Sequence, residues 1–297
     1  MDNNYTTKWV KGIAYEVAFW NNVFRWRHTL KGMMGWSHYG DVISLEGFDA
    51  NAYLNSCQEP VVLDVGCGMS YATGNFIENE KGRQPINLHY VDPLAYDFND
   101  ILKKRKSSLP RIEFGMAEYL SAFYPNNEVD LIIIQNALDH SFDPMKGIME
   151  AIDTLSPNGI LYLNHHPDEA VMEHYKGFHQ WNINCEGDNL VIWNKETKLI
   201  VNELVNTFAQ VTVRRHDNGH VIAIIAKTGN RPAHTADDKR DIRRLCEQTM
   251  MASRYCNKSC AVIKSRLSYW GYNIIQFFAQ AMPWSLKMKV KKLIKQA

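Results

Sequence analysis

Five short apolar runs separated by amphipathic stretches constrain the fold of this chain more than any other feature. The runs are Val61–Val65, Leu88–Val91, Ile112–Phe114, Val129–Ile134 and Ile160–Leu163. Continuous apolar runs of this length, rich in β-branched residues, are typical of parallel strands that are buried on both faces. The pattern therefore predicts an α/β domain with a doubly wound, mostly parallel sheet.

Two later runs, Val211–Arg215 and Val221–Ala226, flank Asp217-Asn218-Gly219. An Asn-Gly pair between runs of this kind is a hairpin signal, so we expect an antiparallel strand at or near one edge of the sheet. Ser156-Pro157-Asn158-Gly159 predicts a turn immediately before the fifth apolar run.

The first 58 residues are rich in aromatic side chains and predict helix. One apolar helical face is formed by side chains spaced three and four apart, namely Trp9, Ile13, Val17, Trp20 and Phe24. This N-terminal cap has two interpretations. It folds over the functional site as a lid, with Trp20 contacting the acceptor, or it only covers the sheet.

Charge is segregated along the chain. From Arg240 to the end there are twelve Lys or Arg against two acids, which gives +10 there and −9 in residues 1–239 for a net charge of +1. In 285–296 an apolar helical face and a lysine-rich remainder favour a helix lying on a membrane surface. Packing on its own domain and a dimer contact are the alternatives. Nucleic-acid binding is not expected, because the main domain is acidic and carries no nucleic-acid motif.

The chain shows no basic stretch leading into an apolar run near Met1 and no apolar stretch of eighteen residues. Its six cysteines show no C-x-x-C pairing and are expected to be free thiols. Cys246, Cys256 and Cys260 match no zinc spacing, so we expect no metal. These features predict a cytoplasmic protein, peripheral on the inner face of the membrane if the tail binds there.

The first apolar run leads into Gly66-Cys67-Gly68-Met69-Ser70 and a helix-compatible stretch, Tyr71–Asn79. Glycines allow a sharp turn and close approach to a ligand, and a helix N-terminus offers free N–H groups. Asp92, at the end of the second run, is placed to accept both hydroxyls of a ribose. Together these features predict an adenosine ligand at the carboxyl ends of adjacent strands.

Two residues indicate whether the adenosine ligand is a dinucleotide or S-adenosylmethionine. A dinucleotide fingerprint has a third glycine where this chain has the bulky Tyr71. Asp64 would repel a diphosphate but suits a ligand that carries an ammonium group. Both favour S-adenosylmethionine, and a nicotinamide-dependent oxidoreductase is the alternative.

From Val61 to Leu163 the chain resembles the domain of class I S-adenosylmethionine-dependent methyltransferases. Asp64-Val65-Gly66-Cys67-Gly68 resembles the first motif of that family, and Gly115-Met116-Ala117-Glu118 resembles its adenine-binding segment. Val129–Ile133 with Asn136–His140 is similar to the fourth motif. The resemblance implies a seven-stranded sheet with the last strand antiparallel, and in-line methyl transfer from S-adenosylmethionine. Domains are then expected at 1–58 (helical cap), 59–230 (methyltransferase) and 231–297 (basic amphipathic helical tail).

The same resemblance implies a set of cofactor-binding residues. They are Asp64, Gly66, Cys67, Gly68, Ser70, Asp92, Pro93, Met116, Ala117, Glu118, Asn136 and Ala137. Ser70, Met116 and Asn158 depart from the commoner residues of the family. These departures leave a third interpretation open, a scaffold that binds the cofactor without chemistry.

Histidines are dense in 165–179, the stretch that follows the fifth run. Ligands of open α/β folds bind beyond the carboxyl ends of the strands, and a neutral histidine there is a suitable general base. We therefore expect a small-molecule or glycan-like acceptor, methylated at oxygen or nitrogen. The expected catalytic residues are His140, His166 and His179, and the expected acceptor contacts are His165, Trp181 and Trp20. The alternative is that each histidine is a packing or surface residue.

Overall fold

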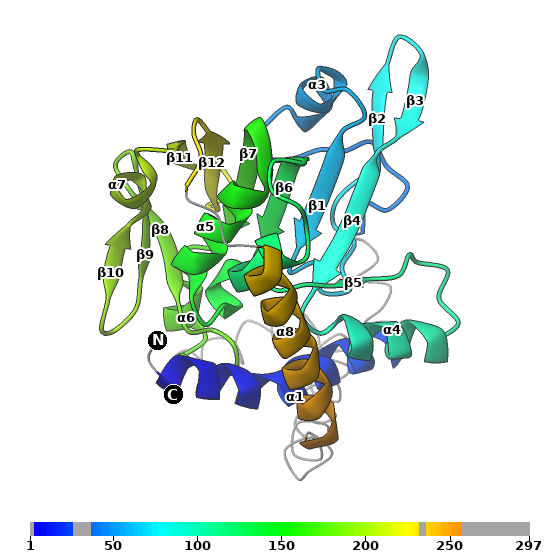
Figure 1. Ribbon diagram of the computed structural model, residues 1–297, viewed down its shortest axis with the longest axis vertical. Coiled ribbons are helices and arrows are strands. Elements are labelled where there is room, and N and C mark those ends of the chain that lie inside the picture. Colours follow the sequence, from blue (N-terminus) through cyan, green and yellow to red (C-terminus); the bar gives the residue numbers. More distant parts are fainter. Residues whose placement is uncertain (1–2, 26–36, 232–235, 257–297) are drawn as a thin grey trace, which may run out of the picture.

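The computed structural model describes residues 3–25, 37–231 and 236–256, and its centre is a seven-stranded sheet (Figure 1). The strands in spatial order are β11 (Ala209–Arg215), β12 (Val221–Lys227), β7 (Leu155–His165), β6 (Val129–Gln135), β1 (Val61–Val65), β4 (Asn87–Asp92) and β5 (Glu113–Phe114). All pairings are parallel except those of β12, which runs antiparallel to both β11 and β7. The predicted seven-stranded, mostly parallel sheet is confirmed, and the antiparallel last strand lies next to one edge.

The strands are apolar on both sides because helices and loops cover both faces of the sheet. Leu63 and Val65 pack in a core with helix α5 (Pro144–Thr154). Val62, on the opposite face, packs with helix α3 (Ala50–Asn55). This alternation along β1 explains why its sequence reads as a continuous apolar run rather than as polar and apolar residues in turn.

The helix predicted at Tyr71–Asn79 is wrong. This stretch is a loop followed by β2 (Phe76–Asn79), which pairs antiparallel with β3 (Gly82–Pro85). Phe76 also exchanges backbone hydrogen bonds with the segment before α3, donating to the carbonyl of Asp41 at 3.2 Å and accepting from Ile43 at 2.7 Å. Pairing partners on both sides thus outweigh the weak local preference for helix.

Other departures from the sequence pattern are smaller. Residues 156–159 form a bulge inside β7, with Asn158 at φ 65°, instead of a turn that precedes the strand. A second antiparallel sheet follows β7 and was not expected. It consists of β8 (Asn182–Glu186), β9 (Asn189–Trp193) and β10 (Lys198–Ile200).

The remaining helices cluster around the carboxyl ends of the parallel strands and the flanks of the sheet. They are α1 (Asn3–Arg25), α4 (Ala95–Lys104), α6 (Glu169–Met172), α7 (Val201–Val205) and α8 (Ala236–Cys256), with 3₁₀ turns η1 (Ala117–Ala122) and η2 (Leu138–His140). Figure 1 shows α1 crossing the edge at which β1 and β4 end. Its predicted apolar face is confirmed, because Trp9, Ile13, Trp20 and Phe24 are buried and Val17 is half-buried.

The C-terminal predictions are only partly covered. Helix α8 confirms that the basic region begins as a helix. Residues 257–297, and with them the predicted membrane-surface segment, lie outside the described residues. Among the helices of the described residues, none combines the length and apolar character needed to cross a membrane.

The docking of α1 can be tested at Gly12. A Cβ on Gly12 would lie 2.3 Å from Cδ1 of Phe178, in the loop before β8. Gly→Ala normally stabilises a helix interior by about 1 kcal/mol. Here overpacking should reverse the sign, and we expect Gly12→Ala to lower the free energy of unfolding by about 1–2 kcal/mol.

Urea unfolding measures this change, with the exposed neighbour Lys11→Ala as control. A Gly12→Ala variant that is more stable than the wild type would show that α1 does not pack on Phe178.

Candidate functional site

The carboxyl ends of β1 and β4 bring the glycine turn and Asp92 together. Val65 pairs with Val91, and the Gly66 N–H donates to the Val91 carbonyl at 2.8 Å. The Gly68 N–H then donates to Oδ2 of Asp92 at 3.0 Å, while the Leu94 N–H donates to Oδ1 at 2.8 Å. The two elements predicted to hold an adenosine are therefore in direct contact.

Each glycine of the turn is required by what packs against it. Gly66 has φ 70°, and a Cβ there would lie 2.5 Å from Cβ of Ala137 at the end of β6. Gly68 has φ 54°, and a Cβ there would lie 2.6 Å from Cζ2 of Trp20 on α1. The turn is thus enclosed by β6 on one side and by α1 on the other.

Two carboxylates are buried beside this turn. Asp64 accepts a hydrogen bond from Oγ1 of Thr73 at 2.8 Å, and burial raises its pKa to about 6. Burial raises the pKa of Asp92 to about 7, partly opposed by its bonds from Leu94 and Gly68, and repulsion from Glu16 on α1 adds to the rise. At both carboxylates burial outweighs the hydrogen bonds that stabilise the anion, so a positively charged or hydroxyl-rich ligand would find acceptors here.

The other expected cofactor residues near the turn are buried or half-buried. The thiol of Cys67 is buried, and burial raises its pKa well above the ordinary value. Oγ of Ser70 donates to the Cys67 carbonyl at 3.0 Å. Pro93 is half-buried directly after Asp92.

A second group of expected cofactor residues lies around η1 and the end of β6. Met116 is buried and precedes η1, whose first residue is the half-buried Ala117. The carboxylate of Glu118 is buried and accepts from Oγ of Ser141 at 2.8 Å and from the Phe142 N–H at 2.9 Å. Asn136, at φ 46°, accepts from the His166 N–H at 2.8 Å.

Three side chains form a cluster directly beyond Ala137, which we call the Asp-His-His cluster: Asp139, His140 and His179. Nδ1 of His179 lies 2.8 Å from Oδ2 of Asp139, and Nε2 of His140 lies 3.5 Å from the same oxygen. The two ring nitrogens are 3.2 Å apart. The fold thus brings two of the three expected catalytic histidines together across 39 residues of sequence.

Electrostatics in the Asp-His-His cluster favour an ionised carboxylate. Burial acts to raise the pKa of Asp139, but His140 and His179 outweigh it and lower that pKa to about 2. Burial acts to lower the pKa of His179, yet its bond to Asp139 makes the net shift upward. Asp139 was missed as a functional residue by the sequence analysis, although it stood in the fourth motif beside His140.

The other histidines of the loop occupy different surroundings. His166 is exposed, and its ring contacts that of His220 at 4.2 Å rather than joining the Asp-His-His cluster. His165 is 1% exposed, and both its ring nitrogens are without a hydrogen-bond partner among the described residues. Burial lowers the pKa of His165 to about 4, so its imidazole is neutral at physiological pH.

Helix α1 spans from the Asp-His-His cluster to the glycine turn. The ring of Trp9 stacks on Phe178 at 5.5 Å, and Phe178 in turn contacts His140 at 5.7 Å. Eleven positions after Trp9, about 16 Å along the helix axis, Trp20 lies on Gly68. The structure therefore places Trp20 at the glycine turn, although it was expected to contact the acceptor. The expected acceptor contact Trp181 is buried and stacks on Tyr5 at 5.3 Å.

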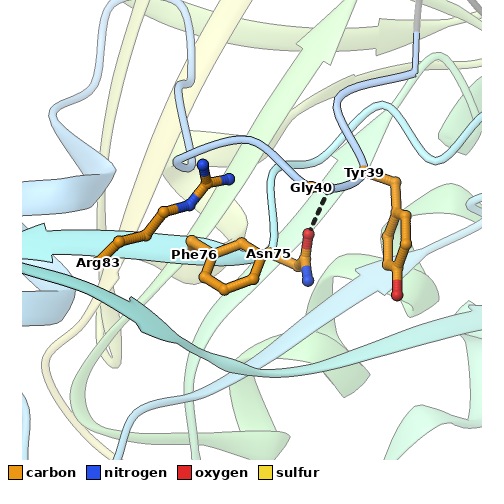
Figure 2. Close-up of a pocket in the computed structure, with 5 residues that line it drawn as sticks. All are labelled: Tyr39, Gly40, Asn75, Phe76 and Arg83. Carbon is orange, nitrogen blue, oxygen red and sulfur yellow. Dashed lines mark hydrogen bonds between the residues drawn. The ribbon is translucent and has the colours of Figure 1, made fainter.

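An open pocket of about 500 Å³ lies elsewhere, beside the β2–β3 hairpin (Figure 2). It is lined by Tyr39, Gly40, Asn75, Phe76 and Arg83. The Arg83 guanidinium lies over the Phe76 ring at 4.2 Å, and the Gly40 N–H donates to Oδ1 of Asn75 at 2.7 Å. None of these residues belongs to the expected site.

Residues 58–203 match the family model described as a methyltransferase domain. These residues form a methyltransferase domain. The matched range begins just before β1 and includes the glycine turn, Asp92 and the whole Asp-His-His cluster. The match favours a methyltransferase over the oxidoreductase that the glycine turn also allowed.

Solved structures of methyltransferases resemble the chain at low identity. A 1,6-didemethyltoxoflavin N1-methyltransferase from Burkholderia thailandensis is 14% identical, with 61% of this chain and 75% of that chain covered and a TM-score of 0.35. A methyltransferase from Aquifex aeolicus is 12% identical, with 61% and 90% covered and a TM-score of 0.34. No curated protein matches the chain.

The contact between α1 and the glycine turn of this methyltransferase can be tested by a double-mutant cycle. Gly68→Ala should cost about 1–2 kcal/mol for the left-handed backbone and about 1–3 kcal/mol for the collision with Trp20. In a Trp20→Leu background the collision is relieved and only the backbone cost remains.

Urea unfolding of the wild type, both single variants and the double variant gives the coupling. We expect about 1–3 kcal/mol of coupling between the two positions, the cost of the collision. Additive effects would mean that Trp20 does not lie on Gly68.

Proposed function

We propose that this methyltransferase methylates a hydroxyl or amine of a small-molecule or glycan-like acceptor at the carboxyl edge of the sheet, beneath α1. The Asp-His-His cluster carries this proposal. It begins two residues after Ala137, which packs on Gly66 of the glycine turn. The residue that packs on the donor-binding turn and the first residues of the Asp-His-His cluster are therefore neighbours on one short stretch of chain.

The residues around the turn suit S-adenosylmethionine, which supplies an electrophilic methyl group when bound. Asp92 is assigned to the ribose hydroxyls and Asp64 to the ammonium group, because both are buried acceptors beside the glycine turn. Gly66, Cys67, Gly68, Ser70 and Pro93 are assigned to the same ligand. The stretches Met116–Glu118 and Asn136–Ala137 are assigned to its adenine side. Trp20 covers the turn from α1 and is assigned to the donor.

The acceptor atom attacks the methyl carbon while the bond from that carbon to sulfur breaks, and alignment of the two is the main task of the protein. A hydroxyl or protonated amine must also lose a proton. An imidazole of the Asp-His-His cluster accepts this proton. Asp139 orients His179 through the 2.8 Å contact and stabilises the imidazolium that forms.

Replacing His179 of the Asp-His-His cluster tests whether the cluster acts on the acceptor. His179→Ala should lower the rate of transfer of a labelled methyl group to candidate hydroxyl and amine acceptors by about a hundredfold or more. Affinity for S-adenosylhomocysteine, measured by calorimetric titration, should change less than about threefold, because the change leaves the glycine turn intact.

His174→Ala is the matched control, because His174 is an exposed histidine of the same loop outside the cluster. Equal transfer rates in the wild type and His179→Ala would remove the Asp-His-His cluster from the reaction. Transfer at no acceptor, with tight S-adenosylhomocysteine binding, would favour the scaffold interpretation.

The pKa of Asp92 predicts how donor binding depends on pH. A ribose bonds best to the ionised carboxylate, and this carboxylate has a pKa of about 7 in the free protein. Lowering the pH through 7 protonates it, so the Kd for S-adenosylhomocysteine should rise about tenfold between pH 8 and pH 6. Asp64, with a pKa of about 6, steepens the loss below pH 6.

The groups that face Asp92 provide the controls. Glu16→Gln removes a repelling carboxylate, so the rise in Kd should move to lower pH. Asp92→Asn should bind S-adenosylhomocysteine more weakly, with little dependence on pH between 8 and 7. A wild-type Kd that is constant from pH 8 to pH 6 would show that Asp92 does not hold the ligand as an anion.

A further inference from the structure

We infer that Asp139, His140 and His179 bind a divalent transition-metal ion of the Zn²⁺ type through Oδ2, Nε2 and Nδ1. Among the residues that the structure describes, one group of three His, Cys, Asp or Glu side chains presents its ligand atoms close enough together to hold an ion, and it is the Asp-His-His cluster. Its carboxylate is buried and its imidazoles are half-buried. The cluster is therefore shielded from solvent, unlike an exposed acidic patch.

The spacing of the three atoms suits a common ion. Zinc bonds to nitrogen and oxygen at about 2.0–2.1 Å, which separates neighbouring ligand atoms by about 3.0 Å in an octahedron and about 3.4 Å in a tetrahedron. The three separations here are 2.8, 3.2 and 3.5 Å. An ion at the centre of this triangle would reach all three atoms with small movements of the side chains.

Protons alone satisfy this arrangement poorly. When Nδ1 of His179 donates to Asp139, Nε2 of His140 faces both a carboxylate oxygen and an N–H group. With a lone pair it is repelled by the carboxylate at 3.5 Å, and with a proton it shares Oδ2 of Asp139 with the N–H of His179 at a distance too long for a good hydrogen bond. A cation removes the conflict, because all three atoms then present lone pairs to it.

Buried polar atoms around the cluster also favour a bound cation. Oδ1 of Asp139 and both ring nitrogens of His165 are buried without a hydrogen-bond partner among the described residues. Unpaired buried polar atoms are rare and call for an explanation such as an ion or its water. His165 is neutral, which is the form of imidazole that binds metals or the water on them.

A metal ion here would narrow the class of methyl acceptor. This inference about the acceptor rests on the proposed function. Two histidines and one carboxylate leave coordination positions open for other ligands. A hydroxyl that binds there becomes more acidic, as metal-bound water does. The imidazoles are then ligands and take up no proton, and the acidified acceptor hydroxyl gives its proton to solvent water. An oxygen acceptor is therefore favoured over an amine.

Metal binding is measured on the full-length protein after dialysis against a chelator, without acceptor. Titration with ZnCl₂ should show a tight site, and CoCl₂ should give a visible absorption band from the same site. His140→Ala, which removes a half-buried ligand, should weaken Zn²⁺ binding by more than about a hundredfold, as should Asp139→Asn. His174→Ala should bind like the wild type.

Affinity for S-adenosylhomocysteine reports that each variant is folded. Zn²⁺ binding that is equal in the wild type, His140→Ala and Asp139→Asn would overturn the inference. Tight binding that is lost in both variants, with no methyl transfer to any acceptor, would uphold the metal site and reject the proposed function. Methyl transfer in a protein that binds no Zn²⁺ would reject the metal site and uphold the proposed function.

Discussion

The pairing of β1 between β4 and β6 is the interaction on which the functional site depends. Parallel strands end at the same edge of a sheet, so this order places Gly66, Asp92 and Ala137 side by side although they are distant in sequence. The register is fixed by apolar residues buried on both faces of β1, because a shift by one residue would exchange the two faces. Every contact of the site begins from these three strand ends.

Helix α1 covers this edge. It packs Gly12 on Phe178, which contacts His140, and Trp20 on Gly68 of the glycine turn. This arrangement excludes water from the buried carboxylates, which is why the pKa values of Asp64 and Asp92 lie so far above those of exposed acids.

Sequence patterns predicted what depends on local composition. The apolar runs gave the strands, and Asn218-Gly219 gave the antiparallel β12. The helix at Tyr71–Asn79 was wrong because the partners of Phe76 lie in another part of the chain, before α3. In the site, His140 and His179 were expected separately. Their convergence on Asp139 was not predictable, since no spacing rule relates positions 40 residues apart.

In the proposed reaction, donor and acceptor meet at this edge, with the glycine turn holding one and the Asp-His-His cluster facing the other. A crystal structure of the complex with S-adenosylhomocysteine is the sharpest test. We expect ribose hydroxyls within hydrogen-bond distance of Asp92 and a sulfur atom directed toward His140 and His179. A ligand bound away from Asp92, or a sulfur atom facing away from both histidines, would contradict it.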